Sequence, residues 1–126
     1  MSKPIETATQ FLEQLGKSKE AMHAAIRTYL TPDTVWENVG LAKTAGIEEA
    51  LGLLAQFEQT MGVDRIRIDT LAIAASGDTV LTERIDYLVG ADGTEHIALR
   101  VMGVLEIKNE KITAWRDYFD TAALSG

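Results

Sequence analysis

The chain has 126 residues and a formal net charge of −7, with 46% hydrophobic and 25% charged residues. This length and composition are typical of one folded domain, and we expect residues 1–126 to form it. The acidic balance argues against a nucleic-acid partner, which needs clustered Lys and Arg. The absence of cysteine excludes disulfides, thiolate catalysis and cysteine-ligated zinc. With an amphipathic N-terminus and no run of about 20 apolar residues, a cytoplasmic protein without a membrane partner is expected.

The first half of the chain shows helical periodicity. Apolar residues recur at helical spacing in three segments, which predicts three helices. These predicted helices span 5–15, 20–30 and 47–61. Pro32 is expected to end the second helix in a turn, because proline cannot continue the hydrogen-bond ladder. A short strand over 34–39 and a loop over 40–45 are expected next, and Gly62 suits the end of the third helix.

The second half alternates apolar with polar residues, which predicts four strands joined by tight turns. The predicted strands span 63–75, 79–89, 94–108 and 111–120. Helices followed by an antiparallel meander predict an α+β fold, in which a curved sheet wraps around helices and forms a cone with an apolar mouth. Gly103, inside the third of these strands, predicts a bulge or a bend.

Charged side chains interrupt the apolar faces of two of these strands. In the last strand, Asp117 shares a face with Thr113 and two large aromatic residues, so burial is expected. In the strand 79–89, Arg84 and Asp86 share a face, but both faces carry charge and alternation alone does not show which points inward. An inward Asp117 needs a cation, and one arginine can bind two carboxylates, which favours the Arg84 face.

The predicted cluster has an unbalanced charge. One arginine and two ionised aspartates leave a net negative charge in an apolar cavity, and a proton kept on one aspartate cancels it. Two carboxyls in different protonation states supply the acid and the base of proton-transfer catalysis. The alternative is a structural ion pair. Asn38, on an inward face with Thr34 and Trp36, could hold a water molecule or instead bond to the backbone at a strand end.

Four segments resemble the limonene-1,2-epoxide hydrolase family in order and spacing. They are Trp36-Glu37-Asn38, Thr82-Glu83-Arg84-Ile85-Asp86, Met102-Gly103-Val104 and the run from Ile112 to Asp120. The resemblance implies the cone-shaped NTF2-like fold, which ketosteroid isomerase and SnoaL-like cyclases share. The chain departs from the family at Trp36, where tyrosine is common, and in having few residues after Asp120, where members carry a longer tail.

The resemblance implies that Asp117 is the general base that activates water and that Asp86 is the acid that protonates the epoxide oxygen. Arg84 would bridge them, and Asn38 would help to hold the water. Trp36, in place of the family's tyrosine, could donate a hydrogen bond to this water but could not accept one. An apolar, cyclic or terpene-like epoxide would then become a vicinal diol in one step, with no metal and no organic cofactor.

Two other functions remain open on the same fold. One is a proton-transfer enzyme like ketosteroid isomerase or a polyketide cyclase, and the other is a non-catalytic module that binds small molecules. A homodimer is expected by analogy with the fold alone.

Overall fold

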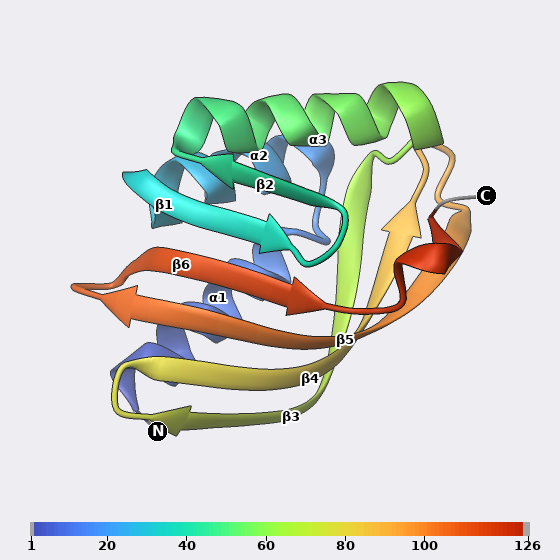
Figure 1. The fold of residues 1–126 in the computed structure, drawn as a ribbon. Coiled ribbons are helices and arrows are strands. Elements are labelled where there is room, and N and C mark those ends of the chain that lie inside the picture. Colours follow the sequence, from blue (N-terminus) through green and yellow to red (C-terminus); the bar gives the residue numbers. More distant parts are fainter. Residues whose placement is uncertain (1, 125–126) are drawn as a thin grey trace.

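The computed structural model describes residues 2–124, whose elements are shown in Figure 1. The helices are α1 (Lys3–Gln14), α2 (Lys19–Tyr29), α3 (Ile47–Met61) and the short 3-10 helix η1 (Thr121–Ala123). The strands are β1 (Leu30–Asn38), β2 (Ala42–Ala45), β3 (Arg65–Ser76), β4 (Thr79–Val89), β5 (Glu95–Lys108) and β6 (Lys111–Tyr118). Within the described part of the chain, no helix is long and apolar enough to cross a membrane.

The strands form one curved sheet in the order β2-β1-β6-β5-β4-β3. Strands β3 to β6 make an antiparallel meander, and β6 pairs with β1 in parallel. The helices cover one face of this sheet, with α1 against β3, β4 and β5 and α3 along β1 and β2 (Figure 1). The hydrophobic core fills the space between the helices and the concave face. The predicted α+β fold with a curved, mostly antiparallel sheet is therefore confirmed.

Local signals in the sequence account for most element boundaries. Ser18 caps α2, because its hydroxyl oxygen accepts a hydrogen bond from the Ala21 amide at 2.9 Å. Helix α3 ends as predicted at Gly62, whose φ of 68° is the left-handed conformation that glycine favours. Asn109 and Glu110 both have positive φ, as the tight hairpin turn between β5 and β6 requires.

The structure corrects three local predictions. Strand β1 begins at Leu30, directly after α2, so Pro32 lies in an irregular part of a strand rather than in a turn. The predicted loop over 40–45 contains β2, which pairs with β1. An extra residue in β6, Thr113, makes a bulge that turns Ile112 inward, so Thr113 is exposed and does not share the face of Asp117.

Candidate active site

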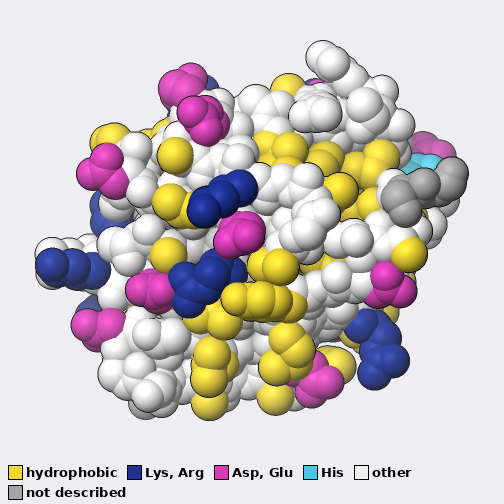
Figure 2. Space-filling model, viewed as in Figure 1, with side chains coloured by type: hydrophobic (Ala, Val, Ile, Leu, Met, Phe, Trp, Pro, Cys, Tyr) yellow, Lys and Arg dark blue, Asp and Glu magenta, His cyan; other side chains and the backbone are white. Residues whose placement is uncertain are grey.

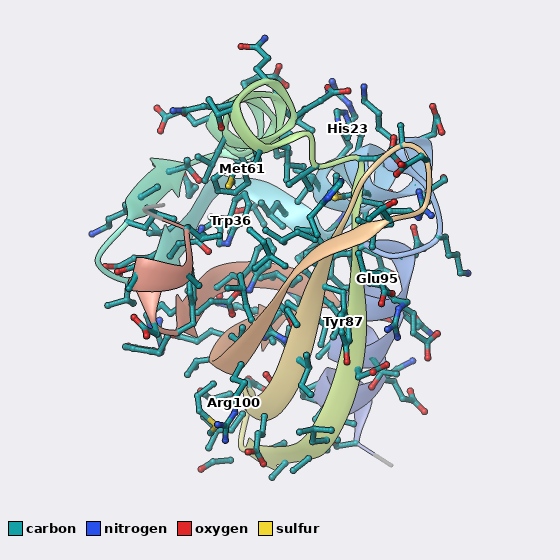
Figure 3. All side chains as sticks on the ribbon, turned by 90° about the vertical axis from the view of Figure 1, so that its right-hand side faces the viewer. His23, Trp36, Met61, Tyr87, Glu95 and Arg100 are labelled. Atoms are coloured by element: carbon teal, nitrogen blue, oxygen red, sulfur yellow. The ribbon has the colours of Figure 1, made fainter. Side chains whose placement is uncertain are left out.

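A cavity lies between α3 and the concave face of the sheet, next to the segment that follows β6. About 40 Å³ of it is accessible to the centre of a water-sized sphere. Its walls are mostly apolar and include Phe57, Met61, Leu99, Val101, Phe119 and Leu124, whereas Asn38, Asp86 and Asp117 supply its polar groups. Figure 3 shows Trp36 beneath Met61, the last residue of α3, at this end of the molecule.

Arg84 joins the two aspartates of the cavity. Its Nε and Nη2 groups donate to the two carboxylate oxygens of Asp86 at 3.1 and 2.8 Å. The same Nη2 group lies 3.0 Å from Oδ2 of Asp117. Arg84 is 1% exposed and sits behind the carboxyl groups, which themselves line the cavity. The prediction that the Arg84 face of β4 points inward is therefore confirmed.

The electrostatics of this cluster follow from its burial. Loss of water raises the pKa of the Asp117 carboxyl above its usual range, although Arg84 and the Trp115 N–H oppose the shift. Burial alone would lower the pKa of Arg84, but Asp117 and Asp86 outweigh burial and raise it. Arg84 therefore stays charged, and Asp117 is a stronger base than an aspartate in water.

Four residues at the site form a row across four strands. Asn38 of β1 is the register partner of Asp117 in β6, which pairs with Gly103 in β5, which in turn pairs with Thr82 in β4. Neighbouring strands lie about 4.8 Å apart, so each residue in the row stands beside the next. The register of the sheet thus places Asn38 beside the carboxyl of Asp117.

Trp115 contributes a contact that we did not predict. Its indole N–H donates to Oδ1 of Asp117 at 3.0 Å, and its ring stacks on Trp36 with centroids 4.4 Å apart. Trp115 precedes Asp117 by two residues on the same face of β6, so the strand period could have indicated this contact. The hydrogen bond orients the carboxyl group, because Trp115 holds Oδ1 while Arg84 holds Oδ2.

Two buried donors at the cavity have no partner within residues 2–124: Nε1 of Trp36 and Nδ2 of Asn38. Both residues line the cavity, as predicted from the inward face of β1. A buried donor without a partner costs about 1–3 kcal/mol, so a ligand or water oxygen in the cavity would be bound there. Because an indole can donate but not accept, Trp36 can offer only a hydrogen to such an oxygen.

Gly103 has a role that the sequence did not predict. Strand pairing is continuous through it on both sides, so the structure has no bulge at Gly103, while the alternative of a bend stays a prediction. A Cβ atom at this position would lie 2.0 Å from Nη1 of Arg84 and 2.6 Å from Oδ1 of Asp117. Glycine is required here because the guanidinium occupies the space of a side chain.

The structure thus brings the predicted site residues to one cavity or, for Arg84, directly behind it. They are Trp36, Asn38, Arg84, Asp86 and Asp117. In the part of the chain that the structure describes, no three carboxylate or imidazole side chains gather as a set of metal ligands. Chemically, the site offers two carboxyls that can exchange protons with a bound molecule. A fixed cation, the guanidinium of Arg84, lies between these carboxyls.

Comparison with known proteins supports the resemblance seen in the sequence. The model of the limonene-1,2-epoxide hydrolase catalytic domain matches residues 2–125. Epoxide hydrolase EphG of Mycobacterium tuberculosis is 37% identical over 91 residues, which are 72% of this chain and 58% of that protein. This chain therefore matches little more than half the length of that relative.

Solved structures agree on the fold. An LEH-like epoxide hydrolase from M. tuberculosis superposes with a TM-score of 0.76 and 30% identity, covering 97% of this chain and 81% of its own. An NTF2-like protein of unknown function from Burkholderia pseudomallei has a TM-score of 0.77 with 18% identity, and the match covers 98% of this chain and 95% of that protein's chain. The second similarity shows the fold alone, and it confirms the predicted NTF2-like architecture.

Proposed function

The chain belongs to the limonene-1,2-epoxide hydrolase family, and from that premise we propose that it hydrolyses an apolar epoxide to a vicinal diol. The observation that carries this proposal is the buried arginine that bridges Asp86 and Asp117 beside an apolar cavity. An epoxide is uncharged, so it suits apolar walls. Its ring opening needs a nucleophile at carbon and a proton at oxygen, and two carboxyls can supply both.

In the proposed reaction Asp117 is the base and Asp86 is the acid. A water molecule next to Asp117 loses a proton to this carboxylate while its oxygen attacks one epoxide carbon. The C–O bond breaks, and the epoxide oxygen takes the proton of Asp86. After the reaction Asp117 holds the proton and Asp86 is ionised, so a proton must return to Asp86 before the next turnover. Once this proton has returned, both carboxyls are in their starting states, and the reaction has consumed only the epoxide and water.

The neighbours of the aspartates suit these roles. Asn38 stands beside Asp117 in the sheet, where its amide can hold the attacking water. The unpaired indole N–H of Trp36 can donate to the water oxygen and leave one lone pair free for attack. Arg84 keeps the cluster near neutrality while protons move between the carboxyls, since its own charge does not change.

The cavity limits the size of the proposed substrate. As it stands, its 40 Å³ is far smaller than the roughly 300–1,000 Å³ of typical small-molecule pockets. A cyclic epoxide therefore enters only if side chains at the edge of the cavity move outward. Met61, Phe119 and the half-buried Leu124 can do so, because Met61 is flexible and the other two lie in or next to the segment after β6. Small cyclic epoxides are the first substrates to test, followed by terpene epoxides.

The proposal is tested by measuring diol formation from a panel of cyclic and terpene epoxides. Wild type should turn over at least one of them, and Asp117→Asn should lose this activity while remaining folded. Asp120→Asn is the matched control, because Asp120 lies three residues further along, is exposed and caps η1, which asparagine can also do. Retained activity in Asp117→Asn would refute the role of Asp117. No turnover on any epoxide would favour a carbon-acid isomerase or a binding module.

We also propose that the protein is a homodimer that pairs through the outer face of the sheet. Figure 2 shows hydrophobic side chains on this face with charges of both signs among them. Leu71, Leu81, Met102 and Tyr118 are each between 45% and 59% exposed. A twofold axis pairs a surface with itself, and a face that carries both signs of charge can satisfy that arrangement. Met102→Glu should give a monomer in sedimentation analysis, whereas a monomeric wild type would refute the dimer.

A further inference from the structure

The guanidinium of Arg84 lies over a gap in the concave face of the sheet. Gly103 makes this gap, since its missing Cβ would lie 2.0 Å from Nη1. Thr82 and Asp117 flank Gly103 as its register partners in β4 and β6. Arg84 is two residues beyond Thr82 on the same face of β4, so its side chain reaches Asp117 by crossing the gap.

The hydroxyl group of Thr82 has a fixed polarity in this arrangement. It donates its hydrogen to the carbonyl oxygen of Gly103 at 3.0 Å. Its oxygen can then only accept, and it accepts from Nη1 of Arg84 at 3.1 Å. Thr82 is 1% exposed, so water does not compete for either bond.

These bonds determine how the guanidinium is turned. With Nη1 held by Thr82 and Nε held by Asp86, the planar group has one orientation, and it places Nη2 between the two aspartates. We propose that Thr82 is a positioning residue, which holds the Arg84 guanidinium over Gly103 so that a single Nη2 group bridges Asp86 and Asp117. Without the hydroxyl, a buried N–H of Arg84 lacks an acceptor and the group turns to find one.

This inference rests on the proposed function, because positioning matters only if the two carboxyls exchange protons with a substrate. It differs from a purely structural role in one testable respect. Valine matches threonine in shape and β-propensity, whereas serine keeps the hydroxyl but loses the methyl group. If Thr82 has only a structural role, Thr82→Val should lower kcat less than Thr82→Ser does. If Thr82 positions Arg84, Thr82→Ser should lower kcat less than Thr82→Val does.

The first experiment compares steady-state kinetics of Thr82→Val and Thr82→Ser on an epoxide that wild type hydrolyses. Thr82→Val should lower kcat by about 10- to 100-fold through misplacement of the carboxyls, while Thr82→Ser keeps kcat within about threefold of wild type. KM should change little, because neither Thr82 nor Arg84 lines the cavity. Thr34→Val is the control: its hydroxyl is also buried and donates to a strand carbonyl, that of Ile112, but it does not contact Arg84.

A second readout does not depend on turnover. The ¹³C resonance of the Asp117 carboxyl, followed against pH without substrate, reports its contact with Arg84. Its titration midpoint should be displaced in Thr82→Val and stay at the wild-type value in Thr82→Ser and Thr34→Val. Unchanged kcat and an unchanged midpoint in Thr82→Val would overturn the inference. Full activity of Asp117→Asn would instead overturn the proposed function, so the two failures are distinguishable.

Discussion

Replacement of Arg84 by methionine tests the electrostatic account of the site most severely. Methionine fills much of the same volume, so the change removes the charge and the hydrogen bonds more than it opens a cavity. It takes away the contacts to Asp86, Asp117 and Thr82 and leaves both carboxyls buried without a cation. Breaking a buried ion pair by removing one partner costs about 3–5 kcal/mol, and we expect a loss of unfolding free energy in this range near neutral pH.

The loss should depend on pH in a defined direction. Burial already raises the pKa of Asp117, and removal of Arg84 takes away the main opposing charge. A carboxyl whose pKa is raised in the folded state stabilises the protein at low pH, and this contribution is lost as pH rises through the folded-state pKa. The difference between wild type and Arg84→Met should therefore be smaller at about pH 5 than at about pH 8.

Urea unfolding followed by circular dichroism at the two pH values measures the loss of unfolding free energy and its dependence on pH. Arg67→Met is the matched control, because Arg67 also contacts two carboxylates, those of Asp69 and Glu95, but at the exposed surface. Screening by water makes such pairs weak, so this control should lose much less stability than Arg84→Met. A loss in Arg84→Met no larger than that of the control, or one independent of pH, would refute the reasoning.

Three further predictions concern Gly103 and Asp117. Gly103→Ala should fold but lose at least about tenfold in kcat, because the new Cβ displaces the guanidinium, whereas Gly52→Ala, with nothing within 4 Å of the added atom, should keep wild-type kcat. In the pH profile of kcat/KM, the apparent pKa of the acid limb should lie above the ordinary aspartate pKa of about 3.9. The base Asp117 must be ionised to act, and its pKa is raised. An acid limb at or below that value would contradict the raised pKa. Asp117→Asn should be no less stable than wild type near neutral pH, because it removes a buried charge, and its advantage in urea unfolding should shrink as pH falls. A variant that becomes relatively more stable as pH falls would argue against a raised pKa of Asp117.

Periodicity in the sequence predicted most of the fold. Helix α3 and strand β4 begin and end at the expected residues, because each has a strong period and a clear turn or cap at its ends. Strand β2 was missed, since its four residues pair only with β1 and have no apolar alternation of their own. The bulge at Thr113 was also missed, because it depends on how β6 aligns with β5 rather than on local composition.

The charged part of the site was predictable for a physical reason. A carboxylate between aromatic residues on a buried face needs a cation, and Arg84 was the residue that could serve two aspartates. The parts that depend on register were not predictable. Thr82 and Gly103 are 21 residues apart in the chain, and only the alignment of β4 with β5 and β6 shows that they surround the guanidinium.

The central claim is that Asp117 activates water for direct attack on the epoxide. A single turnover in ¹⁸O-labelled water, with enzyme in excess over epoxide, tests this claim most directly. Direct attack predicts that the diol of the first turnover carries one ¹⁸O atom and that no label enters the carboxyl of Asp117 or Asp86. A first-turnover diol that contains only ¹⁶O, with label in an enzyme carboxyl, would show attack by an aspartate and contradict the account.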